Sequence, residues 1–214
     1  MEAIEIMAGA VNKDVKIPTA QRMSVECVIQ HEKWVGLKGG FANDLALLRL
    51  HAAHPLNITH KAGGYVNGIC LPSKAKTPFE YLGKARISGW GVTTTKKGGK
   101  SSPVLRYTDV GLIEDKKCRN NSFPFPIVDS MVCQGVDRTS PCFGDSGGPL
   151  VVRINGRYTQ IGVVSTGPSQ CGNDKDPNGV YTQISYFLQW IEDTISRNTK
   201  RNCFGNKLKK FQYN

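Results

Sequence analysis

The nine residues from 142 to 150 read CFGDSGGPL, and this stretch decides how the rest of the chain is interpreted. Ser146 stands in it with glycines on both sides. A serine hydroxyl becomes an effective nucleophile when a base takes its proton and nearby donors stabilise the oxyanion. Glycines let a substrate approach the backbone closely, and the N–H groups of Gly144 and Ser146 can converge as such donors. The alternative, a glycine-rich turn with an incidental serine, is disfavoured by the length and composition of the string.

Working outward, short apolar runs alternate with Gly, Pro and Asn, which is typical of an all-β sandwich or barrel. We expect strands over 4–8, 25–29, 45–50, 84–90, 149–154, 158–165 and 180–184. Asn155-Gly156 separates two of these runs, and this dipeptide favours a tight hairpin turn. From 186 to 195 the apolar residues keep a spacing of about 3.6, which predicts a single C-terminal helix.

Further strings follow one another in a fixed order. They are FANDLALL at 41–48, GICLP at 68–72, SGWG at 88–91, GDSGGP at 144–149 and GVYT at 179–182. With the helix that contains Trp190 and Ile191, they resemble the chymotrypsin/trypsin-type (S1) serine peptidases over about residues 3–197.

The resemblance implies an all-β fold of two antiparallel six-stranded Greek-key barrels, the first incomplete, with a C-terminal α-helix. It also implies a single protease domain over residues 1–214. The expected divisions are a first barrel over about 1–90, a second over about 91–185, a helix over about 186–197 and a basic tail over 198–214.

By the same resemblance Ser146 is the nucleophile, Asp44 orients and charge-stabilises a general-base histidine, and Gly144 and Ser146 form the oxyanion hole. In this family the histidine lies about 45 residues before the aspartate, whereas only 43 residues precede Asp44. The matching position falls a few residues before Met1. We therefore expect this chain to lack the front of the family's domain and to be inactive as written.

The sequence contains four histidines, all of which we expect to be solvated loop residues: His31, His51, His54 and His60. None precedes Asp44 at the position that the resemblance requires.

Asp145 resembles the family's activation-pocket aspartate, which pairs with an N-terminal amine freed by proteolysis. Without that amine it would be a buried, unpaired charge. Such a charge costs several kcal/mol or forces its loop to move.

Seven cysteines without CxxC spacing argue against zinc and for disulfides formed in an oxidising compartment. The resemblance implies the bridges Cys118–Cys133 and Cys142–Cys171. We further expect a Cys27–Cys203 bridge, because the family's C-terminal helix lies against the first barrel. Cys70 would remain free, at the position that ties the family's catalytic domain to a propeptide.

The resemblance places Ser140 at the base of the primary substrate pocket and Gly167 and Gly179 along its walls. An open pocket without charge favours cleavage after Phe, Tyr, Leu or Met. Two departures from the family pattern act against this interpretation. Thr166 replaces a usual tryptophan, and acids at positions 174 and 176 would restore a preference for basic residues if they reached the pocket.

Sequons at Asn57 and Asn120 agree with the cysteines in favouring a secreted, extracellular protein, although the N-terminus has no signal-peptide pattern. No stretch approaches the roughly 20 apolar residues of a membrane span. Protein substrates and protein protease inhibitors are the expected partners, with no cofactor and no metal. Two alternatives remain: a non-catalytic protease homologue that acts as a binding or regulatory module, and a polyanion-binding protein suggested by the net charge of +11.

Overall fold

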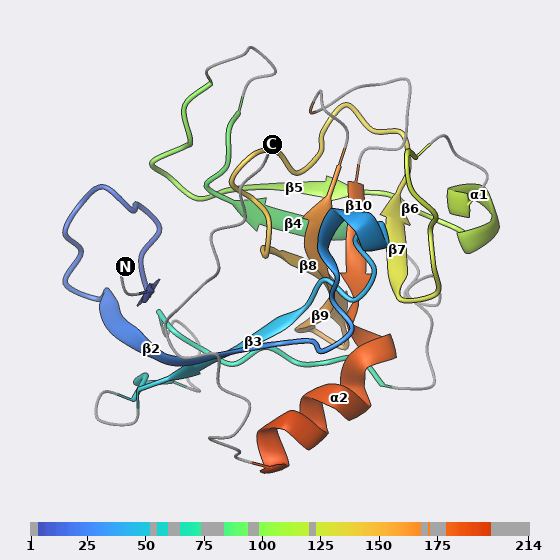
Figure 1. The fold of residues 1–214 in the computed structure, drawn as a ribbon. Coiled ribbons are helices and arrows are strands. Elements are labelled where there is room, and N and C mark those ends of the chain that lie inside the picture. The colour runs from blue at the N-terminus through green and yellow to red at the C-terminus, as the bar shows by residue number, and fades with distance from the viewer. Residues whose placement is uncertain are drawn as a thin grey trace.

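The computed structural model describes residues 4–51, 55–59, 65–73, 84–93, 99–119, 123–167, 171 and 179–197. These residues form a mostly β fold with two antiparallel sheets and a C-terminal helix (Figure 1). Within the described part of the chain, no helix has the length and apolar character needed to cross a lipid bilayer.

The smaller sheet has three strands: β1 (Glu5–Ala8), β2 (Gln21–Gln30) and β3 (Ala46–Leu50), in the order β1-β2-β3. Along β2 the side chains of Met23, Val25 and Cys27 are buried, while the residues between them are exposed. This alternation arises because successive side chains of a strand point to opposite faces of the sheet. Strands predicted at 4–8, 25–29 and 45–50 are thus confirmed, with β2 longer than expected.

The larger sheet has seven strands, in the order β5-β4-β8-β9-β10-β7-β6. They are β4 (Ala85–Gly89), β5 (Arg106–Val110), β6 (Leu112–Ile113), β7 (Met131–Gln134), β8 (Pro149–Ile154), β9 (Arg157–Thr166) and β10 (Gly179–Gln183). Because the first strand, β4, begins at Ala85, this sheet starts before the position near residue 91 at which we expected the second barrel.

Gly111 explains how the larger sheet nearly closes into a barrel. The two end strands of the sheet, β5 and β6, are consecutive in the chain and are separated only by this residue. Gly111 donates its N–H to Asp137 Oδ2 (2.9 Å), and its carbonyl accepts from Gly135 (2.8 Å). The expectation of six strands is therefore wrong. The sheet has seven, because the chain bends at Gly111 and residues 106–113 supply two strands.

The hairpin expected over Asn155-Gly156 is confirmed. β8 pairs with β9 from Pro149↔Val163 to Ile154↔Arg157, and the turn residues have φ angles of 47° and 80°. Positive φ at both central positions gives the turn whose twist matches the flanking strands.

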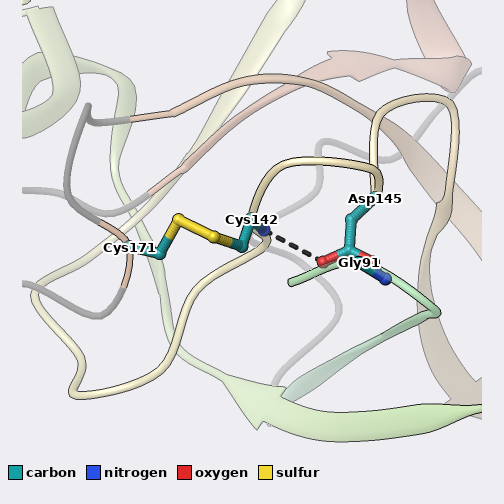
Figure 2. Close-up of a disulfide and its surroundings, with 4 residues drawn as sticks. All are labelled: Gly91, Cys142, Asp145 and Cys171. Atoms are coloured by element: carbon teal, nitrogen blue, oxygen red, sulfur yellow. Dashed lines mark hydrogen bonds between the residues drawn. A yellow bond between two sulfur atoms is a disulfide. The ribbon is translucent and has the colours of Figure 1, made fainter. Parts of the chain in front are cut away.

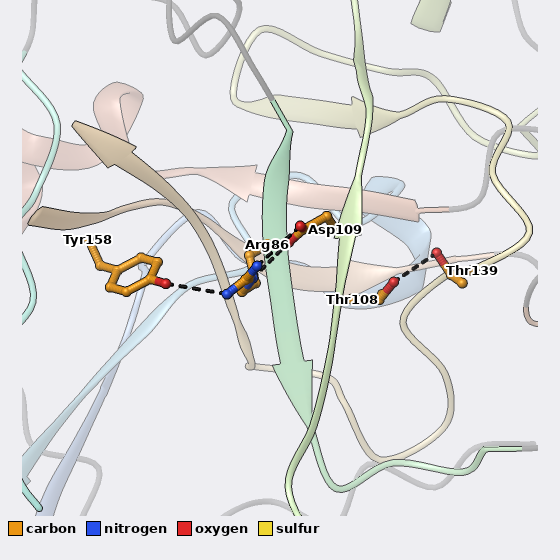
Figure 3. Close-up of polar contacts among 5 residues, drawn as sticks. All are labelled: Arg86, Thr108, Asp109, Thr139 and Tyr158. Carbon is orange, nitrogen blue, oxygen red and sulfur yellow. Dashed lines mark hydrogen bonds and ion pairs between the residues drawn. The ribbon is translucent and has the colours of Figure 1, made fainter. Parts of the chain in front are cut away.

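The barrel core is formed by buried side chains that face one another across this sheet. These are Ala85, Ile87, Val110, Val132, Leu150, Val152, Ile161, Val164 and Tyr181. On the outside, Arg86 forms an ion pair with Asp109 and donates to the hydroxyl of Tyr158 (Figure 3).

The predicted C-terminal helix is α2 (Ile184–Arg197), which begins directly after β10. Its buried residues Ile184, Phe187, Leu188 and Ile191 pack with Leu45, just before β3, and with Val163 of β9. The helix therefore contacts parts of both sheets. Two further short elements that the sequence did not predict are the 3-10 helix η1 (Gly36–Gly39) and α1 (Asp115–Arg119).

Candidate active site

Asp44 lies just before β3 and is tied to the larger sheet by its side chain and its backbone. Ser165 at the end of β9 donates its hydroxyl to Asp44 Oδ2 (2.7 Å). Thr182 of β10 donates its hydroxyl to the Asp44 carbonyl oxygen (2.7 Å). Burial raises the pKa of Asp44, and the bond from Ser165 opposes this because it stabilises the carboxylate.

The loop that carries Ser146 is held against the same end of β9. Gly147 donates its N–H to the Val164 carbonyl (2.8 Å), and Val164 donates to that of Gly148 (2.9 Å). Since Val164 precedes Ser165, Asp44 and the Ser146 loop are attached to neighbouring residues of one strand. Ser146 is exposed.

Gly144 and Gly147 have φ angles of 94° and 82°, a region that favours glycine. Gly144 is also exposed, so its backbone is accessible to a substrate.

The Asp145 carboxylate points toward the backbone of Gly91 and Cys142 (Figure 2). Its Oδ1 accepts from the Gly91 N–H (2.8 Å) and its Oδ2 from the Cys142 N–H (2.9 Å). The expectation of an unpaired charge is thus wrong, because two backbone donors solvate this carboxylate. A Cβ on Gly91 would lie 2.5 Å from the carboxyl carbon, so glycine is required there for the approach.

A cavity of about 330 Å³ opens beside Asp145. Ser140 and Asp145 line it together with Val164 and Cys171. The predicted walls Gly167 and Gly179 are not among its described lining residues, although both are described elsewhere in the structure. The predicted loop acids, Asp174 and Asp176, lie outside the described residues.

His31 contradicts the expectation of four solvated histidines. Its side chain is only 7% exposed, and its ring lies 5.1 Å from Phe187 and 4.9 Å from Trp190, both on α2. The Nδ1 atom accepts from the backbone N–H of Lys33 (3.3 Å). Burial lowers the pKa of His31. Sequence reasoning failed here because His31 is covered by a helix that lies more than 150 residues away in the chain.

Of the other three histidines, one lies within the described part of the structure. His51 is exposed, as expected. His54 and His60 lie outside the described residues.

Two of the three expected disulfides are present, Cys118–Cys133 and Cys142–Cys171, with Cα–Cα distances of 5.9 and 5.5 Å. Cys27 is fully buried and is disulfide-bonded, but its predicted partner Cys203 lies outside the described residues. Cys70 is free and exposed, as expected.

Of the two sequon asparagines, one lies within the described residues. Asn57 is exposed, whereas Asn120 lies outside the described residues.

Sequence reasoning missed the residues that join the pieces of the site. Ser165 and Thr182 lie in strands that it did predict, but their bonds to Asp44 span 121 and 138 residues. A hydroxyl in a strand carries no signal of such a distant partner. Metal-binding clusters of three or more His, Cys, Asp or Glu side chains do not occur among the described residues.

Comparisons with known proteins identify the family of this chain. Residues 1–191 match the Trypsin family. Trypsin-1 of Astacus astacus is 34% identical over 191 residues, which cover 88% of this chain and 74% of that protein. U21-ctenitoxin-Pn1a of Phoneutria nigriventer is 36% identical (84% and 71% covered), and coagulation factor IX of Cavia porcellus is 32% identical (87% and 63% covered). The chain belongs to the trypsin family of serine proteases.

Proposed function

We propose that this domain is a serine endopeptidase in which Ser146 is the nucleophile and Asp44 orients a general-base histidine. One observation carries the proposal: Ser165 binds the Asp44 carboxylate while the neighbouring Val164 pairs with the residues next to Ser146. Segments 100 residues apart in the chain thereby meet at the end of β9.

The chemistry follows from these positions. A base takes the proton of the Ser146 hydroxyl as its oxygen bonds to the carbonyl carbon of the peptide, and the carbonyl electron pair moves to oxygen. The N–H groups of Gly144 and Ser146 stabilise that oxyanion. Collapse breaks the C–N bond, the departing amine takes the proton, and water then hydrolyses the acyl-enzyme.

The 214-residue polypeptide by itself is proposed to be inactive. The position of His31 supports this proposal: its ring lies against α2, whereas the Asp44 carboxylate binds Ser165 on β9. Loss of one triad member leaves only about 10³–10⁴-fold acceleration over water.

The primary pocket is proposed to accept large apolar side chains. Ser140, the proposed base of this pocket, is half-buried, and its hydroxyl carries no charge. An aspartate at the base of such a pocket would instead pair with an arginine or lysine of the substrate. Cleavage after Phe, Tyr, Leu or Met is therefore favoured.

The cavity beside Asp145 is proposed to receive a freed N-terminal amine on activation. The carboxylate lines the cavity, and an ammonium group would add a charged partner to its two backbone donors.

Cys70 is proposed as the attachment point of a disulfide-linked propeptide or regulatory segment in a secreted protein. Its backbone pairs with β9 through bonds to Tyr158 and Gln160 (3.3 and 2.9 Å), and its free thiol is exposed. Protein protease inhibitors would bind the same cleft as protein substrates.

The decisive experiment adds a base from solution. The chain and its Ser146→Ala variant are assayed on a chromogenic peptide that ends in Phe, with and without added imidazole, and are treated with a fluorophosphonate probe. We expect no turnover alone, and turnover with imidazole only where Ser146 is present. Rapid labelling without imidazole would contradict the proposed inactivity, and equal rates with Ser146→Ala would contradict the proposed nucleophile.

A further inference from the structure

Gln134 is a fully buried amide at the end of β7, and the sequence analysis assigned it no role. Its Nε2 donates to the carbonyl oxygen of Thr139 (2.6 Å), and its Oε1 accepts from the hydroxyl of Tyr181 (2.8 Å). Both ends of the amide are thus satisfied. Burial raises the pKa of Tyr181, so the phenol remains a neutral donor and fixes which end of the amide faces it.

The partners of Gln134 are parts of the proposed primary pocket. Thr139 directly precedes Ser140, the proposed base of that pocket. Gln134 also pairs with Gly179, a proposed pocket wall, across the β7–β10 ladder, so the two positions project to the same face. A Cβ on Gly179 would lie 3.3 Å from Gln134 Oε1 and 3.1 Å from the Tyr181 hydroxyl. The Gln134 amide therefore fills the space that a side chain at position 179 would approach.

Thr139 is held from a second direction. Its hydroxyl accepts from that of Thr108 on β5 at 3.3 Å (Figure 3). The backbone before Ser140 is consequently fixed between β5 on one side and the Gln134 amide on the other.

We propose that Gln134 sets the depth of the primary pocket: its side chain closes the space behind Ser140 and Gly179 and positions the Thr139–Ser140 backbone. This inference rests on the proposed function, because it assigns the pocket to the substrate side chain. A pocket closed in this way accepts an aromatic ring but excludes groups that extend beyond its far end.

The test compares two neutral ligands that differ only at the far end of the ring. These are N-acetyl-L-phenylalanine amide and its para-ethyl analogue, titrated by NMR into the intact chain. Binding is used because it requires no general base. We expect the parent chain to bind the shorter ligand more tightly by about tenfold, the lower end of what one methylene contributes in an apolar pocket.

Gln134→Ala should reverse that preference, because it removes the groups that close the pocket. Gln134→Met keeps the volume and loses both hydrogen bonds, so it should lower Tm yet keep the preference of the parent chain. Gln160→Ala is the matched control, since Gln160 lies on β9 of the same sheet and its side-chain amide donates to the Gly162 carbonyl. A merely structural role would weaken both ligands equally and leave their ratio unchanged.

The outcomes distinguish the role of Gln134 from the assignment of the pocket. A reversed ratio in Gln134→Ala alone supports the role of Gln134. An unchanged ratio with binding retained overturns that role and leaves the pocket assignment standing. Failure of the parent chain to bind either ligand overturns the pocket assignment, and this inference with it.

Discussion

At the scale of single residues, the candidate site depends on how half-buried carboxylates are solvated. Among the described residues, Asp145 obtains two backbone N–H donors, whereas Asp44 has one side-chain donor, the hydroxyl of Ser165. An ionised group that loses its buried donor keeps the full cost of its desolvation. The two aspartates therefore differ in how much a single substitution can disturb them.

Ser165→Ala should destabilise the protein by about 1–3 kcal/mol near neutral pH, because the Asp44 carboxylate loses its donor. Since the pKa of Asp44 is already raised above 3.8, protonation relieves the burial of its charge as pH falls through the folded-state pKa. The loss should therefore shrink at acidic pH. Urea unfolding at neutral pH and at acidic pH measures this loss in the free energy of unfolding.

Ser102→Ala is the control for this prediction. Ser102 is also buried, and its hydroxyl donates to an uncharged carbonyl, that of Val104 (2.6 Å). The loss of stability caused by Ser102→Ala should not depend on pH in this range. Equal pH dependence in both variants would show that the Asp44 charge is not the cause.

At the scale of elements, α2 is held to the segment that follows β2 by a cluster of rings. His31 packs between Phe187 and Trp190, and Trp190 Nε1 donates to Glu32 Oε2 (2.9 Å). Burial is the main cause that lowers the pKa of His31, since it disfavours the charged ring; Glu32 raises this pKa and Lys33 lowers it. We therefore expect docking of the helix to be sensitive to acid.

Stability should fall as pH drops below the unfolded-state pKa of His31, near 6.5, because the unfolded chain then binds more protons than the native one. The loss continues until pH reaches the lower folded-state pKa. His31→Phe keeps an apolar ring against α2 and should flatten this dependence. Urea midpoints between about pH 7.5 and pH 5 measure it. The exposed-histidine variant His51→Gln should keep the slope of the parent chain, and an equally flat profile in that variant would refute the assignment.

An element could be predicted where its signal lies within its own short stretch of sequence. The β8–β9 hairpin is specified by two apolar runs and Asn155-Gly156, and the helix by its own periodicity. β5 and β6 were missed because Arg106–Val110 is mostly exposed and Leu112–Ile113 is only two residues long. β7 was missed because it has only four residues and all of them are buried, so it shows no alternation. The burial of His31 could not be predicted either, since it is imposed by a helix distant in the chain.

At the scale of the whole molecule, the two sheets are joined by the cluster around α2. Phe187 is 2% exposed in that cluster, whereas its neighbour Tyr186 is 56% exposed on the same helix. Burial of Phe187 therefore contributes to holding Leu45, just before β3, against Val163 of β9.

Phe187→Ala should cost about 3–5 kcal/mol, the usual range for removing a buried aromatic side chain. Tyr186→Ala, which removes an exposed ring, should cost less than about 1 kcal/mol. Urea unfolding followed by both tryptophan fluorescence and far-UV circular dichroism measures the two variants. Similar losses in both would show that α2 is not the connection between the sheets.

The hydrogen bond between Ser165 and Asp44 also bears on the order in which the chain folds. It spans 121 residues, whereas the β8–β9 hairpin closes over a two-residue turn. Closing a long loop costs entropy before its contacts form, so local structure precedes distant pairing. In a partly folded chain the hairpin that follows Ser146 would then be formed while Asp44 is still unattached. The proposed catalytic group would thus be assembled in one of the last steps of folding, and a nascent chain could not cleave its neighbours.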